Sequence, residues 1–177
     1  MKQTKLDNYF NIKLKKDPKT PNNTPIYGPT NNPINNISFN NFKLYDTLPK
    51  YVLRFDGASK GNPGISGAGA VLYYNNEEIW HGTIYLGKQT NNYAEYYGMI
   101  IGLQEAKKKG ISNLYIEGDS KLVINQMKGI YNVKSSNLLD LYKKAKLLVL
   151  SFDTIDYKHI YRDQNKRADE LANIAVK

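Results

Sequence analysis

Hydrophobic and polar residues follow regular periods from residue 50 onward, whereas residues 11–48 show no sustained apolar period. Runs rich in β-branched and aromatic residues indicate strands, and apolar runs between an Asn or Ser cap and a closing Gly indicate helices. We predict strands at 51–56, 67–74, 78–86, 113–117 and 154–159. We predict helices at 91–109, 120–128, 137–150 and 165–176, with a Gly/Pro-rich loop at 57–66 and a hairpin turn at Asn75-Asn76.

This order of elements predicts an α/β fold. Three consecutive strands form an antiparallel meander, and strands then alternate with helices, so we expect a five-stranded mixed sheet flanked by helices. The first long helix carries small residues at a spacing of four, namely Ala94, Gly98, Gly102 and Ala106. Such a ridge allows the helix axis to approach a neighbouring element closely and would hold Glu95 near the sheet.

The composition divides the chain near residue 50. Six of the seven prolines and ten asparagines lie before it, and this segment contains no Glu, Arg or Ala. We predict a short N-terminal peptide at 1–10, a flexible linker at 11–48 and one folded domain at 49–177.

Charge and cysteine content narrow the class of protein. The formal net charge is +9, with seven Lys against three Asp in residues 1–49. A basic chain suits a polyanionic partner, and the alternative is solubility together with a Lys-rich coding bias. The chain has no cysteine, so a disulfide framework and thiolate metal sites are excluded. With no signal-like apolar stretch and no apolar run of membrane-spanning length, we expect an intracellular protein.

Four carboxylates at the ends of predicted strands or the starts of predicted helices are the candidate chemistry: Asp56, Glu95, Asp119 and Asp169. Each has an ordinary structural explanation, respectively an Asp-Gly turn, a helix-dipole contact in a first turn, an N-cap and a solvated helix start. If they converge, however, their repulsion must be relieved by protonation or by hard cations. Mg²⁺ prefers oxygen ligands and commonly binds between carboxylates and phosphates, which points to metal-dependent phosphodiester chemistry.

The segments around these carboxylates match one family in order and spacing. They are Asp56-Gly57-Ala58-Ser59 with Gly61-Asn62-Pro63-Gly64, Thr90-Asn91-Asn92-x-Ala94-Glu95, Gly118-Asp119-Ser120, and His159-x-x-Arg162-x-x-Asn165-x-x-Ala168-Asp169. The stretch Gln126-x-x-Gly129-x-Tyr131-x-Val133-Lys134 is also similar. On these residues, the segment 51–177 resembles the type 1 ribonuclease H domain, which implies an RNase H-like fold and a catalytic domain at 49–177.

The resemblance implies endonucleolytic cleavage of the RNA strand of an RNA–DNA hybrid, leaving 5′-phosphate and 3′-hydroxyl ends. Two Mg²⁺ ions, with Mn²⁺ as a substitute, would lie about 3.5–4 Å apart at the scissile phosphate. By family analogy Asp56 contacts both ions, Glu95 and Asp119 hold the ion near the leaving oxygen, and Asp169 holds the ion that activates water.

The same resemblance suggests residues that bind the hybrid, namely Ser59, Lys60, Gly61, Asn62, Asn91, Asn92 and Gln126. Amide side chains both donate and accept hydrogen bonds, as recognition of a 2′-hydroxyl requires. The alternatives are helix capping for Asn91 or Asn92 and surface solvation for Gln126.

One departure concerns histidine. Many family members carry a histidine on a longer loop before the last Asp, but here the loop is short and the two histidines are His81 and His159. We expect a structural role for His159 at the end of the last strand and a surface or packing role for His81.

The N-terminal peptide contains Gln3, Leu6, Tyr9 and Phe10 in the pattern Q-x-x-[LIM]-x-x-[FY]-[FY]. This resembles the peptide that binds PCNA-type sliding clamps, in which a 3₁₀ turn gathers the apolar residues into one plug. A chance match in a Tyr- and Asn-rich chain is the alternative.

We therefore expect a monomeric ribonuclease H tethered to a sliding clamp, which removes primers or R-loops at replication sites, in the nucleus of a eukaryotic host or the cytoplasm otherwise. Two alternatives are a non-catalytic RNase H-like adaptor that binds nucleic acid or protein, and a fragment of a retroelement polyprotein.

Overall fold

The computed structural model describes residues 50–177, and the predicted clamp-binding peptide (1–10) and linker (11–48) lie outside the described residues. The strands are β1 (Tyr51–Gly61), β2 (Gly64–Tyr74), β3 (Glu77–Gln89), β4 (Asn113–Gly118) and β5 (Thr154–His159). The helices are α3 (Asn91–Lys108), α4 (Lys121–Met127), α5 (Ser136–Val149), the 3₁₀ helix η1 (Arg162–Gln164) and α6 (Lys166–Ile174).

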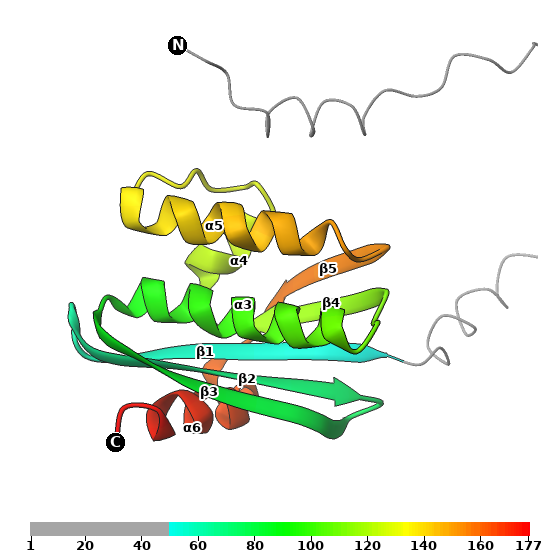
Figure 1. Cartoon of the computed structure of the whole chain (residues 1–177), viewed down its shortest axis with the longest axis horizontal. Helices are drawn as coiled ribbons and strands as arrows, with labels where there is room; N and C mark the ends of the chain where they lie inside the picture. The colour runs from blue at the N-terminus through cyan, green and yellow to red at the C-terminus, as the bar shows by residue number, and fades with distance from the viewer. Residues whose placement is uncertain (1–49) are drawn as a thin grey trace, which may run out of the picture. The chain divides into compact units, whose positions relative to one another are not determined.

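The five strands form one mixed sheet in the order β3-β2-β1-β4-β5. The pairs β1–β2 and β2–β3 are antiparallel, and the pairs β1–β4 and β4–β5 are parallel. Helices α3, α4 and α5 lie on one side of the sheet and α6 lies on the other (Figure 1). The predicted meander, the alternation that follows it and the mixed sheet are confirmed. Among the described residues, no helix has the length and apolarity needed to cross a membrane.

The predicted loop at 57–66 is wrong, because β1 continues to Gly61 and β2 begins at Gly64. Antiparallel pairing runs unbroken from Gly57↔Ala68 to Gly61↔Gly64. Two of the glycines that suggested a loop have other purposes: Gly61 has a φ of 98° in the left-handed region, and Gly57 permits close packing. A Cβ on Gly57 would clash with the backbone nitrogen of Glu95, so this glycine lets α3 lie directly against the strand.

The other boundary signals are mostly confirmed. Asn75 and Asn76 have φ values of 50° and 69°, as a two-residue hairpin turn requires. Gly110 follows α3 with a φ of 69° in the left-handed region, which ends the helix. The cap of α3, however, is Thr90, whose Oγ1 accepts from the Tyr93 N–H at 3.3 Å. Thr90 has the extended backbone of a cap residue, whereas Asn91 and Asn92 are already the first two residues of the helix.

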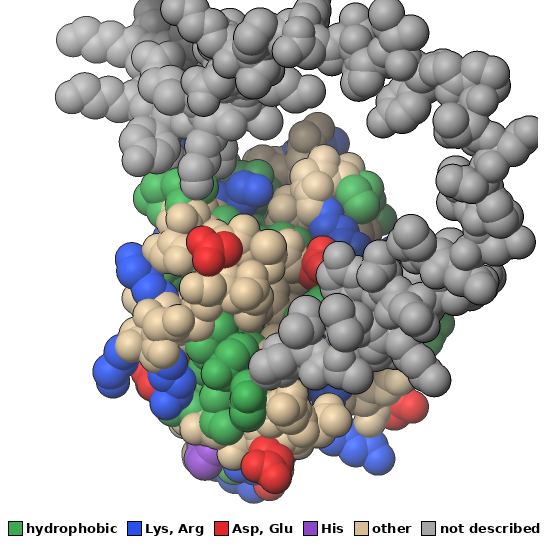
Figure 2. Space-filling view, turned by 90° about the vertical axis from the view of Figure 1, so that its right-hand side faces the viewer, with side chains coloured by type: hydrophobic (Ala, Val, Ile, Leu, Met, Phe, Trp, Pro, Cys, Tyr) green, Lys and Arg blue, Asp and Glu red, His purple; other side chains and the backbone are tan. Residues whose placement is uncertain are grey.

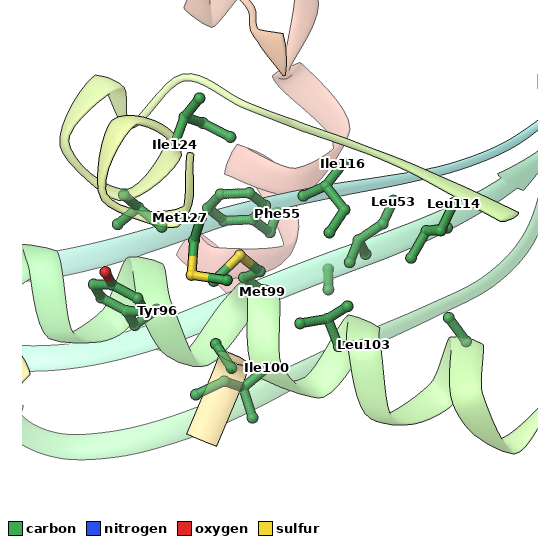
Figure 3. Close-up of a cluster of buried hydrophobic side chains, with 14 of the residues drawn as sticks. Leu53, Phe55, Tyr96, Met99, Ile100, Leu103, Leu114, Ile116, Ile124 and Met127 are labelled. Carbon is green, nitrogen blue, oxygen red and sulfur yellow. The ribbon is translucent and has the colours of Figure 1, made fainter. Parts of the chain in front are cut away.

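The main core fills the space between the sheet and helices α3, α4 and α5 (Figure 3). Ten of its largest fully buried side chains point toward one another from both layers: Leu53, Phe55, Tyr96, Met99, Ile100, Leu103, Leu114, Ile116, Ile124 and Met127. Burial of each such side chain stabilises the fold by about 1.5–3 kcal/mol relative to exposure. A smaller cluster of Val71, Ala168 and Leu171 attaches α6 to the opposite face.

The small-residue ridge of α3 meets β1 as predicted. A Cβ on Gly98 would lie 2.7 Å from the carbonyl oxygen of Asp56 and 2.9 Å from that of Gly69. On Gly102, a Cβ would clash with the side chain of Leu53. These contacts bring the axis of α3 close to the centre of the sheet.

We therefore expect Gly98→Ala to destabilise the protein, although alanine is the better helix former. Overpacking costs about 1–3 kcal/mol, which exceeds the gain of about 1 kcal/mol in helix propensity. Urea denaturation measures the difference in unfolding free energy. The control is Gln104→Ala at an exposed position of the same helix, and a Gly98→Ala protein as stable as that control would contradict the proposed close packing.

Candidate active site

Asp56, Glu95 and Asp119 come together at one point of the fold. Each offers one carboxylate oxygen, and these three oxygens lie within 4.8 Å of one another. The strand register brings the two aspartates together, because Phe55 pairs with Gly118 in the parallel β1–β4 ladder and an aspartate follows each. Glu95 reaches the same point from α3. The helix backbone beside this glutamate lies against Gly57, the residue after Asp56.

Asp56 is the central member of this cluster. Asp56 is 6% exposed, and its Oδ1 accepts a hydrogen bond from the Gly57 N–H at 2.9 Å. Burial, and after it the charges of Asp119 and Asp169, together raise the pKa of Asp56 to about 7, although the Gly57 N–H and Arg162 oppose the shift. Burial and like charges oppose the ionisation of this carboxyl, and a bound cation would favour its charged form.

Glu95 is also buried, and it lies deeper in α3 than the sequence predicted. With Thr90 as the cap, Glu95 is the fifth residue of the helix, and the first turn has no acidic residue, so a helix-dipole contact does not explain it. Its Oε2 is buried and has no hydrogen-bond partner among the described residues. Burial and the nearby charges of Asp56 and Asp119 raise the pKa of Glu95 well above its usual value.

The donor set of this cluster fits a divalent cation. It has an unpartnered buried carboxylate oxygen and two carboxyls with raised pKa values. Hard cations such as Mg²⁺ bind such oxygen ligands. An unpaired buried carboxylate destabilises the folded protein, so three acidic groups at this spacing have no role in stability alone.

Asp169, the fourth predicted carboxylate, is not part of that group. It lies in the first turn of α6, where its Oδ1 accepts from Arg162 Nη2 at 2.6 Å and its Oδ2 accepts from Asn173 Nδ2 at 3.1 Å. Its charge is still close enough to raise the pKa of Asp56. The ion pair in turn raises the pKa of Arg162. Asp169 therefore borders the acidic cluster with its carboxylate neutralised by an arginine.

Asn165 is a site residue to which the sequence analysis gave no role, although it belongs to the quoted motif. Its side chain is fully buried, and its Nδ2 donates to Asp119 Oδ1 at 2.7 Å and to the Phe55 carbonyl at 2.9 Å. Its Oδ1 has no partner among the described residues. The spacing Arg162-x-x-Asn165-x-x-x-Asp169 was the available signal, but only the fold shows that the amide contacts Asp119.

The predicted hybrid-binding residues of the β1–β2 hairpin lie beside the start of α3. Asn62 Oδ1 accepts from the backbone N–H of Asn91 at 3.1 Å, which joins the hairpin tip to the helix. Lys60, Gly61, Asn62 and Asn92 are exposed. Ser59 is partly buried and its Oγ donates to the Gln89 carbonyl at 3.0 Å. The hairpin tip and the helix start thus form one polar surface.

Gln126 and the two histidines have clear structural contacts. Gln126 is 4% exposed, so surface solvation is wrong; its Oε1 accepts from the Tyr96 hydroxyl at 2.8 Å and its Nε2 donates to the Asn132 carbonyl at 3.3 Å. His159 Nε2 lies 3.1 Å from the Asp119 carbonyl oxygen, consistent with a structural role. His81 Nδ1 lies 2.7 Å from Glu78 Oε1 at the surface.

The face of the molecule seen in Figure 2 carries both basic and acidic side chains and has no large patch of one sign. Basic and acidic side chains are spread over that face with polar and hydrophobic side chains between them. The net charge of +9 can attract a polyanion from a distance.

The sheet order and the acidic cluster define a ribonuclease H-like protein, and comparisons with known proteins agree. A model of the reverse transcriptase-like family matches residues 54–175. The bifunctional protein Rv2228c of Mycobacterium tuberculosis is 42% identical over 133 residues, which cover 72% of this chain and 35% of that protein. Ribonuclease HI of Halobacterium salinarum is 38% identical over 123 residues, which cover 69% of this chain and 62% of the relative.

Solved structures show the same similarity. The N-terminal RNase H domain of Rv2228c superposes with a TM-score of 0.70 at 41% identity, covering 73% of this chain and 94% of that structure. LC11-RNase H1, solved in complex with an RNA/DNA hybrid, gives a TM-score of 0.69 at 32% identity, covering 72% and 96%.

The chain therefore belongs to the reverse transcriptase-like family and contains an RNase H-like domain. It spans about a third of the length of the mycobacterial protein.

The raised pKa of Asp56 predicts how the metal-free protein responds to pH. A carboxyl with a pKa of about 7 in the folded state and about 3.9 in the unfolded state lowers stability as the pH rises from 4 to 7, because the unfolded state ionises first. In EDTA at pH 8, Asp56→Asn should thus be more stable than the parent protein by about 1–4 kcal/mol.

Urea denaturation in EDTA at pH 8 and at pH 4.5 measures this difference, which should shrink at the lower pH. Asp140→Asn on the exposed side of α5 is the control and should change little. A less stable Asp56→Asn protein at pH 8 would show that the cluster does not oppose the ionisation of Asp56.

Proposed function

We propose that the domain is a ribonuclease H that cleaves the RNA strand of RNA–DNA hybrids and leaves 5′-phosphate and 3′-hydroxyl ends. The observation that carries this proposal is the meeting of Asp56, Glu95 and Asp119 within 4.8 Å. Membership of the family and relatives called ribonuclease HI support it. A hybrid-bound structure of LC11-RNase H1 supports the choice of substrate.

The cofactor we propose is a pair of Mg²⁺ ions, for which Mn²⁺ can substitute. Asp56, Glu95 and Asp119 would hold them, together with Asp169 once its carboxylate is released from Arg162. When bound, such ions activate a water molecule and stabilise the charge on the phosphate and the leaving oxygen. Arg162 neutralises the Asp169 carboxylate, and Asn165 Nδ2 donates to Oδ1 of Asp119.

Selection of RNA by its 2′-hydroxyl is assigned to the polar surface at the hairpin tip and the start of α3. A 2′-hydroxyl both donates and accepts hydrogen bonds, so it requires both kinds of partner. The donors and acceptors on this surface come from Ser59, Lys60, Gly61, Asn62, Asn91 and Asn92. The buried Gln126 would act indirectly, because its amide joins α3 to the backbone at Asn132.

Asp56→Asn should abolish Mg²⁺-dependent cleavage of a hybrid oligonucleotide while the domain stays folded. The asparagine can still accept from the Gly57 N–H, but it removes the charge that would hold a cation. We expect the rate to fall at least about 10³-fold, as for loss of one member of a group that acts as a unit. A labelled-strand cleavage assay with and without Mg²⁺ measures the loss, and circular dichroism checks the fold.

Asp140→Asn, which changes an exposed acid on α5, serves as the matched control and should cleave at the parent rate. Full activity of Asp56→Asn would refute the metal role of this residue. If the parent protein binds hybrids but never cleaves them, the chain is instead a nucleic-acid adaptor.

We further propose that residues 1–10 tether the nuclease to a PCNA-type sliding clamp, which would direct a monomeric enzyme to primers or R-loops at replication sites inside the cell. This proposal is supported by the sequence of Gln3, Leu6, Tyr9 and Phe10. A linker of about 38 residues would allow a search of about 30–40 Å around the clamp.

The double substitution Tyr9→Ala with Phe10→Ala should remove clamp binding and leave cleavage of short hybrids unchanged, because the plug is lost while the domain is intact. Fluorescence anisotropy with the clamp of the source cell measures the affinity. Tyr27→Ala with Phe39→Ala removes two aromatic residues outside the pattern and is the control. Equal affinities for both double variants would end the tether hypothesis.

A further inference from the structure

A pair of charged residues precedes the two aspartates of the acidic cluster on the same two strands. Arg54 precedes Asp56 by two residues on β1, and Glu117 precedes Asp119 by two residues on β4. Arg54 and Glu117 are partners in the parallel register. Because side chains two apart on a strand share a face, this pair lies on the same face of the sheet as Asp56.

The guanidinium of Arg54 uses all three of its nitrogens. Nε and Nη2 each lie 2.9 Å from Glu117 Oε2, and Nη1 donates to the carbonyl oxygen of Gln164 at 3.0 Å. Glu117 is 8% exposed, so its carboxylate requires this partner, and Lys158 Nζ approaches its Oε1 only to 3.9 Å. The fixed planar fork of an arginine suits this arrangement, whereas a lysine ammonium offers a single centre.

The third contact connects this pair to the acidic cluster. Gln164 ends the three-residue helix η1, and the next residue is Asn165, whose Nδ2 holds Asp119. The amide of Asn165 has one workable orientation, because a reversed amide would turn its oxygen toward both Asp119 Oδ1 and the Phe55 carbonyl. Within the segment, the Gln164 N–H donates to the Tyr161 carbonyl and the Asn165 N–H donates to the Arg162 carbonyl. Arg54 adds a contact from β1 to this backbone, directly ahead of Asn165.

We propose that Arg54 is a positioning residue for the candidate metal site. Glu117 holds the guanidinium of Arg54 in place, and Arg54 in turn binds the Gln164 carbonyl and fixes the backbone before Asn165. The amide of Asn165 then sets the direction of the Asp119 carboxylate. This inference rests on the proposed function, since it assigns the purpose of Asp119 to cation binding.

An ordinary cross-strand ion pair is the competing explanation. It would account for the contacts between Arg54 and Glu117, but it would not explain the hydrogen bond from Arg54 Nη1 to the Gln164 carbonyl. The two explanations differ in what Arg54→Lys changes. Loss of an ordinary ion pair lowers stability alone, whereas loss of an anchor for Asn165 also weakens cation binding.

The test measures Mn²⁺ binding by the substrate-free full chain, using isothermal titration calorimetry, so that the readout is independent of cleavage. Partners of metal ligands typically affect metal affinity by about 10–100-fold, and Arg54 lies one contact further away. We expect Arg54→Lys to weaken Mn²⁺ binding about three- to tenfold. Val52→Ala is the matched control, because Val52 is buried two residues earlier on the same strand and contacts no site residue through a polar group.

Glu117→Gln provides a second variant in case Arg54→Lys fails to fold. Its amide oxygen can keep one contact to Arg54, so a smaller loss of about two- to threefold is expected. The double variant should lose no more affinity than Arg54→Lys, because both substitutions act through the same anchor.

Unchanged Mn²⁺ affinity in both single variants, in a parent protein that binds Mn²⁺ and cleaves hybrids, would overturn the role of Arg54 and leave the proposed function intact. An equal loss in Val52→Ala at equal thermal destabilisation would also overturn it. A parent protein that neither binds Mn²⁺ nor cleaves hybrids would refute both proposals.

Discussion

The mutual repulsion of three carboxylates in a partly buried space is the constraint on which the rest of this structure depends. Their oxygens lie within 4.8 Å, and burial together with like charge raises the pKa values of Asp56 and Glu95. A fold maintains such a group only where other contacts determine its position. Here the β1–β4 register and the contact of α3 with Gly57 supply those contacts, so the cluster is held by the centre of the sheet.

Glycine permits this arrangement from both sides of the sheet. Gly57 and Gly98 let α3 lie against β1, and a Cβ on Gly69 would come within 2.5 Å of the backbone nitrogen of Ala172 in α6. Both helices that carry predicted acidic residues therefore approach the same part of the sheet. The absence of side chains at these positions is what allows Glu95 and the α6 segment to border one site.

Two arginines have opposite relations to the site. Arg162 neutralises Asp169 and keeps that carboxylate apart from the other three, whereas Arg54 contacts no member of the cluster and instead binds Glu117 and the Gln164 carbonyl. Both contacts converge on the segment from η1 to the first turn of α6. This segment contributes Asp169 and also Asn165, whose amide contacts Asp119, so its position affects how these two carboxylates lie.

The sequence by itself determined the order of the elements, the turn at Asn75-Asn76 and the set of acidic residues, because each depends on local periodicity, backbone preference or a short motif. Tertiary structure decided the rest. Pairing with β2 made residues 57–61 a strand, packing buried Gln126, and the fold turned the amide of Asn165 toward Asp119. These features depend on residues distant in the chain, so no local pattern could reveal them.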